Sequence, residues 1–447
     1  MTFPRFKLEQ SKQEFYTSNS GLALVGVALN RFTTLASRVD KAAPKRGIAT
    51  SDVVRSYLGL LCQGKSDFAA IRPFFEDDDF FRSALGLQKT PSPETLRQRL
   101  DQFAEVLRII VDFCSVEFLK KAKAALSPLA TGHMPFDLDV FTLDNSDTKK
   151  EGVSYTYRGF NGYAPIGAWL GLEGWCLEIE QRPGSQHAQE GFIPLLLRTI
   201  RKSRELTDVP LLVRLDSAHD AIATLVTLKE EEVDFIVKWN PRKTDVPIKA
   251  TEIFAHGKTI RQDEKGRIAI MTEIVERSYK DDSNATKTIK VRRVLRATER
   301  NFEKDGTALL FPRVEIEGWW TSLSLNKETI IDLYKGHALC EQYHSELKTD
   351  LDLERLPSGK FATNALVMSC AGLAYNLLRA VGQVGLMNKK QARRAKQRRR
   401  LKTVLQDLMS FAARFIRHSH TLTLRFSCHA SWQAQAFVKT YNQFAYD

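Results

Sequence analysis

The sequence has few cysteines for its length, and they lie far apart. Six cysteines among 447 residues form neither the close pairs of a zinc site nor the density of a disulfide framework. No internal repeat is visible, and the longest apolar stretch, near Gly21 to Leu29, is too short to cross a membrane. The N-terminus lacks the apolar segment of a secretion signal. We therefore expect a reducing, intracellular setting without membrane insertion.

Basic residues are in excess, and much of the excess is local. The formal net charge is +13 and the isoelectric point is near 9.4. The segment from Lys389 to Lys402 holds nine basic residues and no acid. Such a run favours an anionic partner, most commonly nucleic acid. The alternative is a solvated helix face or a tail.

The pattern of apolar residues predicts an α/β protein with two to four domains. Residues up to about 135 read as mostly helical. Beyond them, PLLVRLDSAHD (210–220), an amphipathic segment and VDFIVKW (233–239) follow one another as strand, helix and strand. Between residues 238 and 311, alternating runs separated by polar turns predict an antiparallel β meander. A later apolar helix, ATNALVMSCAGLAYNLLRAV, is expected to cover the sheet.

A strip of unlike side chains follows the meander. In YKGHALCEQYHSELK (334–348), Tyr334, Glu341 and Lys348 recur every seven residues, and His337 lies one turn before Glu341. Because each helical residue advances by roughly 100°, these four side chains would share one face of a continuous helix. A buried strip would carry Leu, Ile or Val instead. The mixture predicts chemistry on nucleic acid.

Three acids form a candidate catalytic set. Asp144 ends an apolar run in FTLDNSD, Asp216 follows the strand in VRLDSAHD, and Glu341 lies on the predicted helix. Open α/β sheets bind their ligands at strand ends. Three carboxylates can hold two Mg²⁺ ions about 3.5–4 Å apart, one activating water or a 3′-hydroxyl and the other stabilising the leaving oxygen.

At these residues the chain resembles the DDE transposases of bacterial insertion sequences, which have an RNase H-like catalytic core. Their glutamate lies in a Tyr-x₂-Arg-x₃-Glu-x₆-Lys pattern. Tyr334, Glu341 and Lys348 match it, and His337 replaces the arginine. The order of NGYAPIGAW, QRPGSQHAQEG, VRLDSAHD, the β-rich insert and the late basic segment is most similar to the thirteen-eighty group.

The resemblance implies a mechanism and a set of partners. Asp144, Asp216 and Glu341 would bind two Mg²⁺ or Mn²⁺ ions, cut the element's ends and join the 3′-hydroxyls to target DNA. The protein would act as a homodimer on DNA, in the bacterial cytoplasm at the nucleoid. Expected DNA contacts are Tyr334, His337, Lys348, Arg393, Arg394, Lys396, Arg398, Arg399 and Arg400.

The resulting division of the chain has five parts. We predict a mainly helical DNA-binding domain (1–135), an RNase H-like catalytic domain in two pieces (136–238 and 312–385) around a β-rich insertion (239–311), and a basic C-terminal region (386–447). Trp319 and Trp320, at the end of the insertion, would either pack in the strand or support a flipped base.

Two other functions are compatible with the same residues. One is a non-catalytic DNA-binding regulator descended from a transposase. The other is a metal-dependent nuclease of the RNase H superfamily that cuts without joining strands. The presence of all three acids argues against the regulator. A strand-transfer assay would separate the nuclease, because cleavage and joining use the same carboxylates.

Overall fold

The computed structural model describes residues 16–44, 47–75, 79–242, 244–280, 284–303, 305–387, 397–418, 421–427, 429 and 431–446. Contacts group the chain into two compact units. Unit 1 combines Met1–Ala124 with Glu346–Asp447, and unit 2 is Ala125–Ser345. The first division lies close to the predicted boundary at residue 135. Residues 346–385 group with the N-terminal helices, whereas the sequence assigned them to the catalytic domain.

Unit 2 is a mixed α/β unit, as predicted. Its strands are β2 (Met134–Val140), β3 (Leu143–Asp144), β4 (Ser154–Tyr155), β5 (Asn161–Tyr163), β6 (Ile166–Leu170), β7 (Trp175–Glu180), β8 (Leu211–Leu215), β9 (Asp234–Lys238), β10 (Lys258–Asp263), β11 (Gly266–Lys280), β12 (Thr286–Phe302) and β13 (Ala308–Thr321). Its helices are α7 (Phe192–Arg204), α8 (Ile222–Glu230), α9 (Asp245–His256), α10 (Lys327–Lys335) and α11 (Leu339–Ser345), with 3₁₀ turns at Ser217–His219 and Gly336–Ala338.

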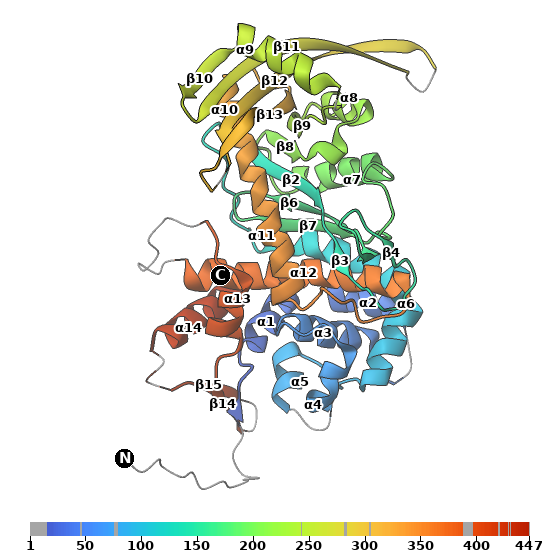
Figure 1. The fold of residues 1–447 in the computed structure, drawn as a ribbon. Helices are drawn as coiled ribbons and strands as arrows, with labels where there is room; N and C mark the ends of the chain where they lie inside the picture. Colours follow the sequence, from blue (N-terminus) through green and yellow to red (C-terminus); the bar gives the residue numbers. More distant parts are fainter. Residues whose placement is uncertain are drawn as a thin grey trace. The chain divides into compact units, whose positions relative to one another are not determined.

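Nine strands form one sheet in the order β10-β11-β12-β13-β9-β8-β2-β6-β7. β2, β8 and β9 are parallel to one another, and every other pairing is antiparallel. Helices α7 and α8 lie along one face and α10 and α11 along the other (Figure 1). β2 is therefore central, with β8 beside it and helices on both faces. A separate three-stranded sheet, β3-β5-β4, follows β2 in the chain.

The predicted meander is present, and it extends the main sheet. β10 to β13 are joined as consecutive antiparallel pairs. β13 then pairs with β9 through Trp319–Thr321. An apolar cluster that includes Ile270, Val294, Trp319 and Ile330 packs α10 against this part of the sheet. The alternation of apolar and polar residues thus predicted the strands of the meander correctly. Burial of one face of these strands against α10 explains their register.

Unit 1 is mainly helical. Its elements are β1 (Tyr16–Thr17), α1 (Leu22–Phe32), α2 (Leu35–Ala42), α3 (Thr50–Leu61), a 3₁₀ turn (Phe68–Ile71), α4 (Arg72–Phe75), α5 (Asp79–Leu85), α6 (Pro93–Lys121), a π-helical turn (Glu346–Asp350), α12 (Phe361–Leu386), α13 (Leu401–Val404), a second π-helical turn (Leu405–Met409), β14 (Ala413–His418), β15 (Thr421–Arg425) and α14 (Ser431–Ala445). Ser92 caps α6 by accepting a hydrogen bond from the Thr95 amide at 3.2 Å, as expected of a Ser-Pro helix start.

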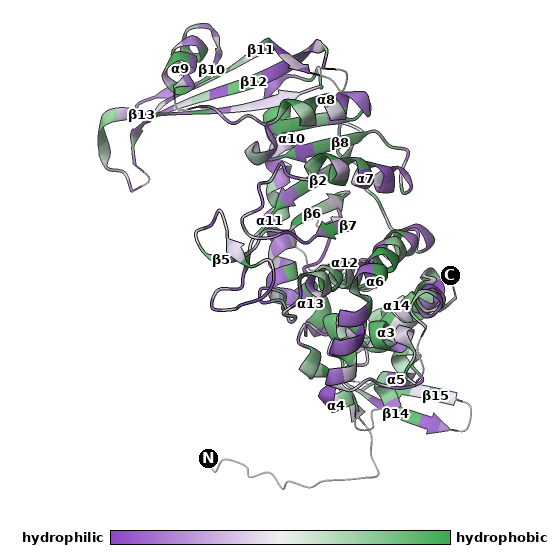
Figure 2. Cartoon of the chain, turned by 90° about the vertical axis from the view of Figure 1, so that its right-hand side faces the viewer, coloured by the Kyte–Doolittle hydropathy of each residue, from purple (hydrophilic) through white to green (hydrophobic). Residues whose placement is uncertain are grey.

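Helix α12 belongs to unit 1, whereas the sequence led us to expect a helix of the catalytic domain that covers its sheet. It packs against α6, α3, α13 and α14. By length and composition alone it could cross a membrane, yet 94% of its apolar window is buried inside the protein, as in a core helix. Its hydrophobic character can be followed in Figure 2. A helix that is apolar on all sides requires partners on all sides, which other helices provide and one face of a sheet does not.

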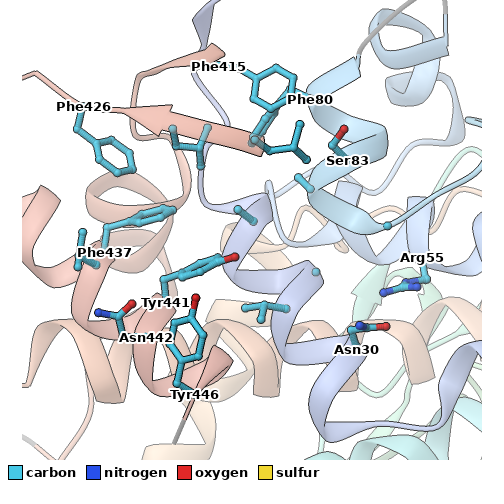
Figure 3. A pocket seen from close by; sticks show the side chains of 18 residues that line it. Asn30, Arg55, Phe80, Ser83, Phe415, Phe426, Phe437, Tyr441, Asn442 and Tyr446 are labelled. Atoms are coloured by element: carbon cyan, nitrogen blue, oxygen red, sulfur yellow. The ribbon is translucent and has the colours of Figure 1, made fainter. Parts of the chain in front are cut away.

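Unit 1 also contains a hollow of about 770 Å³. Aromatic side chains of the C-terminal segment, among them Phe415, Phe437 and Tyr441, line one side (Figure 3). Asn30 and Arg55, from α1 and α3, line the other. Burial lowers the pKa of Arg55, although the nearby charge of Asp52 acts in the opposite direction. All the residues that line this hollow belong to unit 1.

Candidate active site

The pairing of β2 with β8 decides which acids meet. These strands run parallel with Asp137 opposite Arg214. Continuing that register by two residues aligns Asp139 with Asp216, and both then lie on the face occupied by Asp137 and Arg214 because strand side chains alternate. Asp216 follows β8 directly, and its Oδ1 accepts a hydrogen bond from the Ala218 amide at 3.2 Å. Two carboxylates are therefore neighbours at the carboxyl ends of adjacent parallel strands.

The electrostatics of the two acids agree with this placement. Burial raises the pKa of Asp139 to about 7, and the charges of Asp216 and Asp137 add to the effect although His337 opposes it. Burial also raises the pKa of Asp216. Neighbouring carboxylates in a poorly solvated site resist simultaneous ionisation. A cation placed between them would relieve that cost.

Beneath this pair lies a buried ion pair. The Arg214 guanidinium donates to both oxygens of Asp137 at 2.6 and 2.7 Å, and Nη1 donates to the Leu333 carbonyl at 2.9 Å. His337 Nδ1 lies 3.0 Å from Asp137 Oδ1. Burial would lower the pKa of His337, but the hydrogen bond and charge of Asp137 outweigh it, so the pKa is raised.

Asp137, His337 and Cys340 together resemble a metal-ligand group, with potential ligand atoms within 4.8 Å of one another. The arrangement does not suit a metal ion, because Arg214 already supplies a cation to both oxygens of Asp137. Burial raises the pKa of the Cys340 thiol well above its usual range, which keeps the sulfur protonated. A thiol is a poor ligand compared with a thiolate. We interpret this group as structural support.

Helix α11 carries the third candidate acid, Glu341. α11 packs against β2, and His344 Nδ1 lies 3.9 Å from Asp139 Oδ2. His337 and His344, which both face the acids of β2, are four residues before and three after Glu341. Within α11, at roughly 100° per residue, Glu341 lies about 60° around the helix from His344. Its side chain is exposed, as a group that receives a substrate must be.

Asp144 takes a different place from the one predicted. It lies on β3, in the small sheet, opposite Gly162, and its Oδ1 accepts a hydrogen bond from the Ser146 amide at 2.9 Å. The buried strand whose end reaches Asp216 is MPFDLDV, not the later FTLD. The acid that the β2–β8 register aligns with Asp216 is therefore Asp139. This difference revises the proposed set of acids.

The predicted continuous helix from Tyr334 to Lys348 is broken. α10 ends at Lys335, a 3₁₀ turn spans Gly336–Ala338, and a π-helical turn follows α11. The Tyr334 ring packs against Trp319 and His337, with centroids 6.0 and 5.6 Å apart, and burial raises its pKa. Lys348 belongs to unit 1, where Nζ lies 3.6 Å from Glu354 Oε2. Tyr334 and His337 are thus packing groups behind the acids, contrary to the DNA contacts expected of them.

Only part of the basic segment from Lys389 to Lys402 lies within the described residues. Arg393, Arg394 and Lys396 lie outside the described residues. Arg398 Nη1 bonds to Glu346 Oε1 at 2.8 Å, and the Arg400 guanidinium bonds to Asp350 at 3.0 Å. Arg399 Nε donates to the Leu386 carbonyl at 3.3 Å. Arg398 in particular is committed to a buried acid, which speaks against the predicted phosphate contact for it.

Glu346 is the most heavily bonded of these acids. Its side chain and that of Arg379 are each only 1% exposed and lie 2.6 Å apart. Tyr375 and the Leu401 amide also donate to it, at 3.1 Å each. A buried carboxylate needs such a set of donors. The network fixes the segment from Arg398 to Leu401 against α12.

Sequence reasoning missed three residues beside the acids. The sequence carried a signal for Asp139, because side chains alternate along a strand and FDLDV therefore has Asp137 and Asp139 on one face. In a parallel sheet this strand can lie beside the strand that ends at Asp216. His344 and Tyr157 carried no such signal, since their positions depend on how α11 and a later hairpin pack. Trp319 and Trp320 are buried, in agreement with the strand-packing alternative.

The fold and the site together define a class: an α/β protein with carboxylates gathered at the ends of parallel strands. The family profile of the transposase DDE domain, group 1, matches residues 76–445. The chain therefore belongs to this transposase family, whose activity is DNA transposition and recombination. Mixed α/β architecture and DNA as the partner are consistent with that membership.

Other comparisons add little. No curated protein matches the sequence. Among solved structures, a piggyBac transposase in a synaptic complex with hairpin DNA is similar over 94% of this chain and 80% of that chain, with 10% identity and a TM-score of 0.40. A likeness of that degree supports no argument about this protein.

Proposed function

We propose that the protein cleaves the ends of an insertion sequence and joins the freed 3′-hydroxyls to target DNA, using Asp139, Asp216 and Glu341 as its three acids. The observation that carries this assignment is the parallel register of β2 and β8, which pairs Asp137 with Arg214 and, continued by two residues, aligns Asp139 with Asp216. Family membership supplies the reaction class. In this proposal Asp139 replaces Asp144, which was the first acid expected from the sequence.

The donor set fits divalent metal ions. Asp139, Asp216 and Glu341 offer only carboxylate oxygens, the ligands that Mg²⁺ and Mn²⁺ prefer. Burial raises the pKa of both Asp139 and Asp216, so a bound cation would favour their ionised forms. When bound, two such ions would activate the attacking oxygen and stabilise the leaving one. The three acids would hold them.

The residues around the acids have positioning roles in this proposal. Arg214 and His337 neutralise and orient Asp137, and so fix the strand that carries Asp139. His344 lies against Asp139 and stacks on Phe141, with ring centroids 4.5 Å apart. Strands and packed rings hold a site more rigidly than loops do.

Four further features belong to the proposal. The order β7-β6-β2-β8-β9, in which β6 alone runs antiparallel to the other four strands, supports an RNase H-like core with the meander inserted after its last strand. We place the protein in the thirteen-eighty group on its motif order. Pairing two element ends favours a homodimer on DNA, with unit 1 as end-reader. The expected location is the cytoplasm, at the nucleoid.

The test is an assay of strand cleavage and strand transfer. Wild type and Glu341→Gln are incubated with DNA carrying candidate element ends and Mg²⁺ or Mn²⁺. We expect joined products from wild type and none from the variant. Cleavage without joining by wild type would favour the nuclease, and Glu341-independent products would contradict the proposal. DNA binding without any product would favour the regulator.

Metal affinity is expected to depend on pH. Because only the ionised carboxylate binds metal, and the pKa of Asp139 is raised to about 7, Mn²⁺ affinity should rise up to about tenfold per pH unit below pH 7 and level off above it. Titration calorimetry between pH 5.5 and 8 measures this. Asp144→Asn is the control and should keep the wild-type profile. An affinity that stays flat below pH 7 would refute the raised pKa.

A further inference from the structure

A hairpin beside the acids presents two exposed tyrosines and an arginine. β4 and β5 pair Tyr155 with Asn161, and the turn between them is closed by Thr156, whose amide and hydroxyl both donate to the Phe160 carbonyl at 2.8 Å. Gly159 adopts φ +89° there. The tight turn presents Tyr157 and Arg158 at its tip.

Tyr157 is tied to the strand that carries Asp139. Its hydroxyl donates to the carbonyl of Val140, the next residue after Asp139, at 3.4 Å. Burial raises the pKa of that hydroxyl, and the charges of Asp139 and Asp216 add to the effect. The side chain as a whole nevertheless remains 63% exposed, so the ring extends from the edge of the site toward solvent.

Arg158 supplies a cation at the same point. Its guanidinium lies 5.4 Å from the centre of the Tyr157 ring and is exposed. A planar ring that is held at its hydroxyl loses little conformational entropy when a base stacks on it. A neighbouring guanidinium can bind the phosphate attached to that base. An aromatic ring next to a cation is the combination with which proteins hold unpaired nucleotides.

We propose that Tyr157 stacks on the base adjoining the scissile phosphate and that Arg158 binds the next phosphate, so that the cleaved DNA end stays in the site until it is joined. This inference rests on the proposed function. It deepens that function by assigning a nucleotide subsite to the β4–β5 hairpin. Tyr157 acts there as a substrate-binding residue and takes no part in proton transfer.

The test combines variants with DNA lacking single bases. End cleavage is measured with wild type, Tyr157→Ala and Tyr157→Phe on substrates with an abasic nucleotide at each position within three of the cut. Loss of one stacked base costs roughly tenfold in affinity. We expect Tyr157→Ala to raise KM about tenfold with kcat within threefold, and Tyr157→Phe, which keeps the ring but loses the bond to Val140, to raise KM less than Tyr157→Ala does. An abasic nucleotide at one position should weaken cleavage by wild type and have no further effect on Tyr157→Ala. The missing base and the missing ring would then be the two partners of one interaction.

The matched control is Tyr155→Ala. Tyr155 lies in the same hairpin and is 66% exposed, and we expect its loss to change KM less than threefold. Equal effects at both tyrosines, or abasic effects that are the same in wild type and Tyr157→Ala, would overturn the inference. Mn²⁺ affinity of Tyr157→Ala should equal that of wild type. If Glu341→Gln still forms products, the proposed function fails. If Glu341→Gln is inactive and Tyr157→Ala has the KM of wild type, only the stacking proposal is refuted.

Discussion

Asp139→Asn is expected to lower both end cleavage and strand transfer by about 10³-fold or more, while Asp144→Asn changes them less than threefold. Metal ions contribute several kcal/mol to such transition states, and about 1.4 kcal/mol corresponds to each factor of ten in rate. An asparagine in place of Asp139 keeps the shape of the side chain and removes a negative ligand. Asp144 lies on the small sheet, where its Oδ1 bonds to the Ser146 amide.

The two variants are compared in single-turnover assays with Mg²⁺, and circular dichroism confirms that both fold. Asp139→Asn should be at least as stable as wild type without metal, because it removes a carboxylate that is costly to ionise in the site. Full activity of Asp139→Asn together with an inactive Asp144→Asn would restore the assignment made from the sequence. It would also show that β2 contributes no metal ligand.

Arg379→Met is expected to destabilise unit 1 by about 3 kcal/mol, which corresponds to roughly 5–10 °C in melting temperature. Arg379 and Glu346 are almost fully buried and lie 2.6 Å apart. Removing Arg379 takes one of two cations from the buried Glu346 carboxylate and leaves Arg398, and breaking one partner of a buried pair costs more than the net strength of the intact pair. Thermal unfolding followed by circular dichroism measures the shift.

Arg400→Met is the matched control for that experiment. Arg400 also bonds to an acid of the Glu346–Asp350 turn, at 3.0 Å, but its side chain is 49% exposed. Solvent screens such a pair, so we expect a cost below about 1 kcal/mol. Equal shifts for the two variants would mean that burial does not set the strength of this network.

The outline of the catalytic unit could be predicted from sequence, because its signals are local. The apolar runs before Asp216 and in VDFIVKW, and the alternation from residue 266 onward, each depend on residues close in the chain. The choice between Asp139 and Asp144 could not be made in that way. Both follow apolar residues, and only the pairing of β2 with a strand more than seventy residues later decides which one meets Asp216.

The basic segment and α12 show the same limit. Arg398 and Arg400 read as part of one cationic run, yet they neutralise Glu346 and Asp350, some fifty residues earlier. α12 reads as a helix that covers a sheet, yet helices surround it. In both cases the deciding fact is the identity of a distant partner, which neither periodicity nor composition encodes.

The Asp137–Arg214 pair also specifies how the chain folds. A strand can slip by two residues and keep its apolar face inward, so hydrophobic patterning alone does not forbid that error between β2 and β8. After such a slip Arg214 would face Asp139 or Pro135, and Asp137 would be buried without its cation, a change that typically costs about 3–5 kcal/mol. The same ion pair that supports the acids thus favours one register of β2 and β8 over the slipped ones. That register is also the one that aligns Asp139 with Asp216.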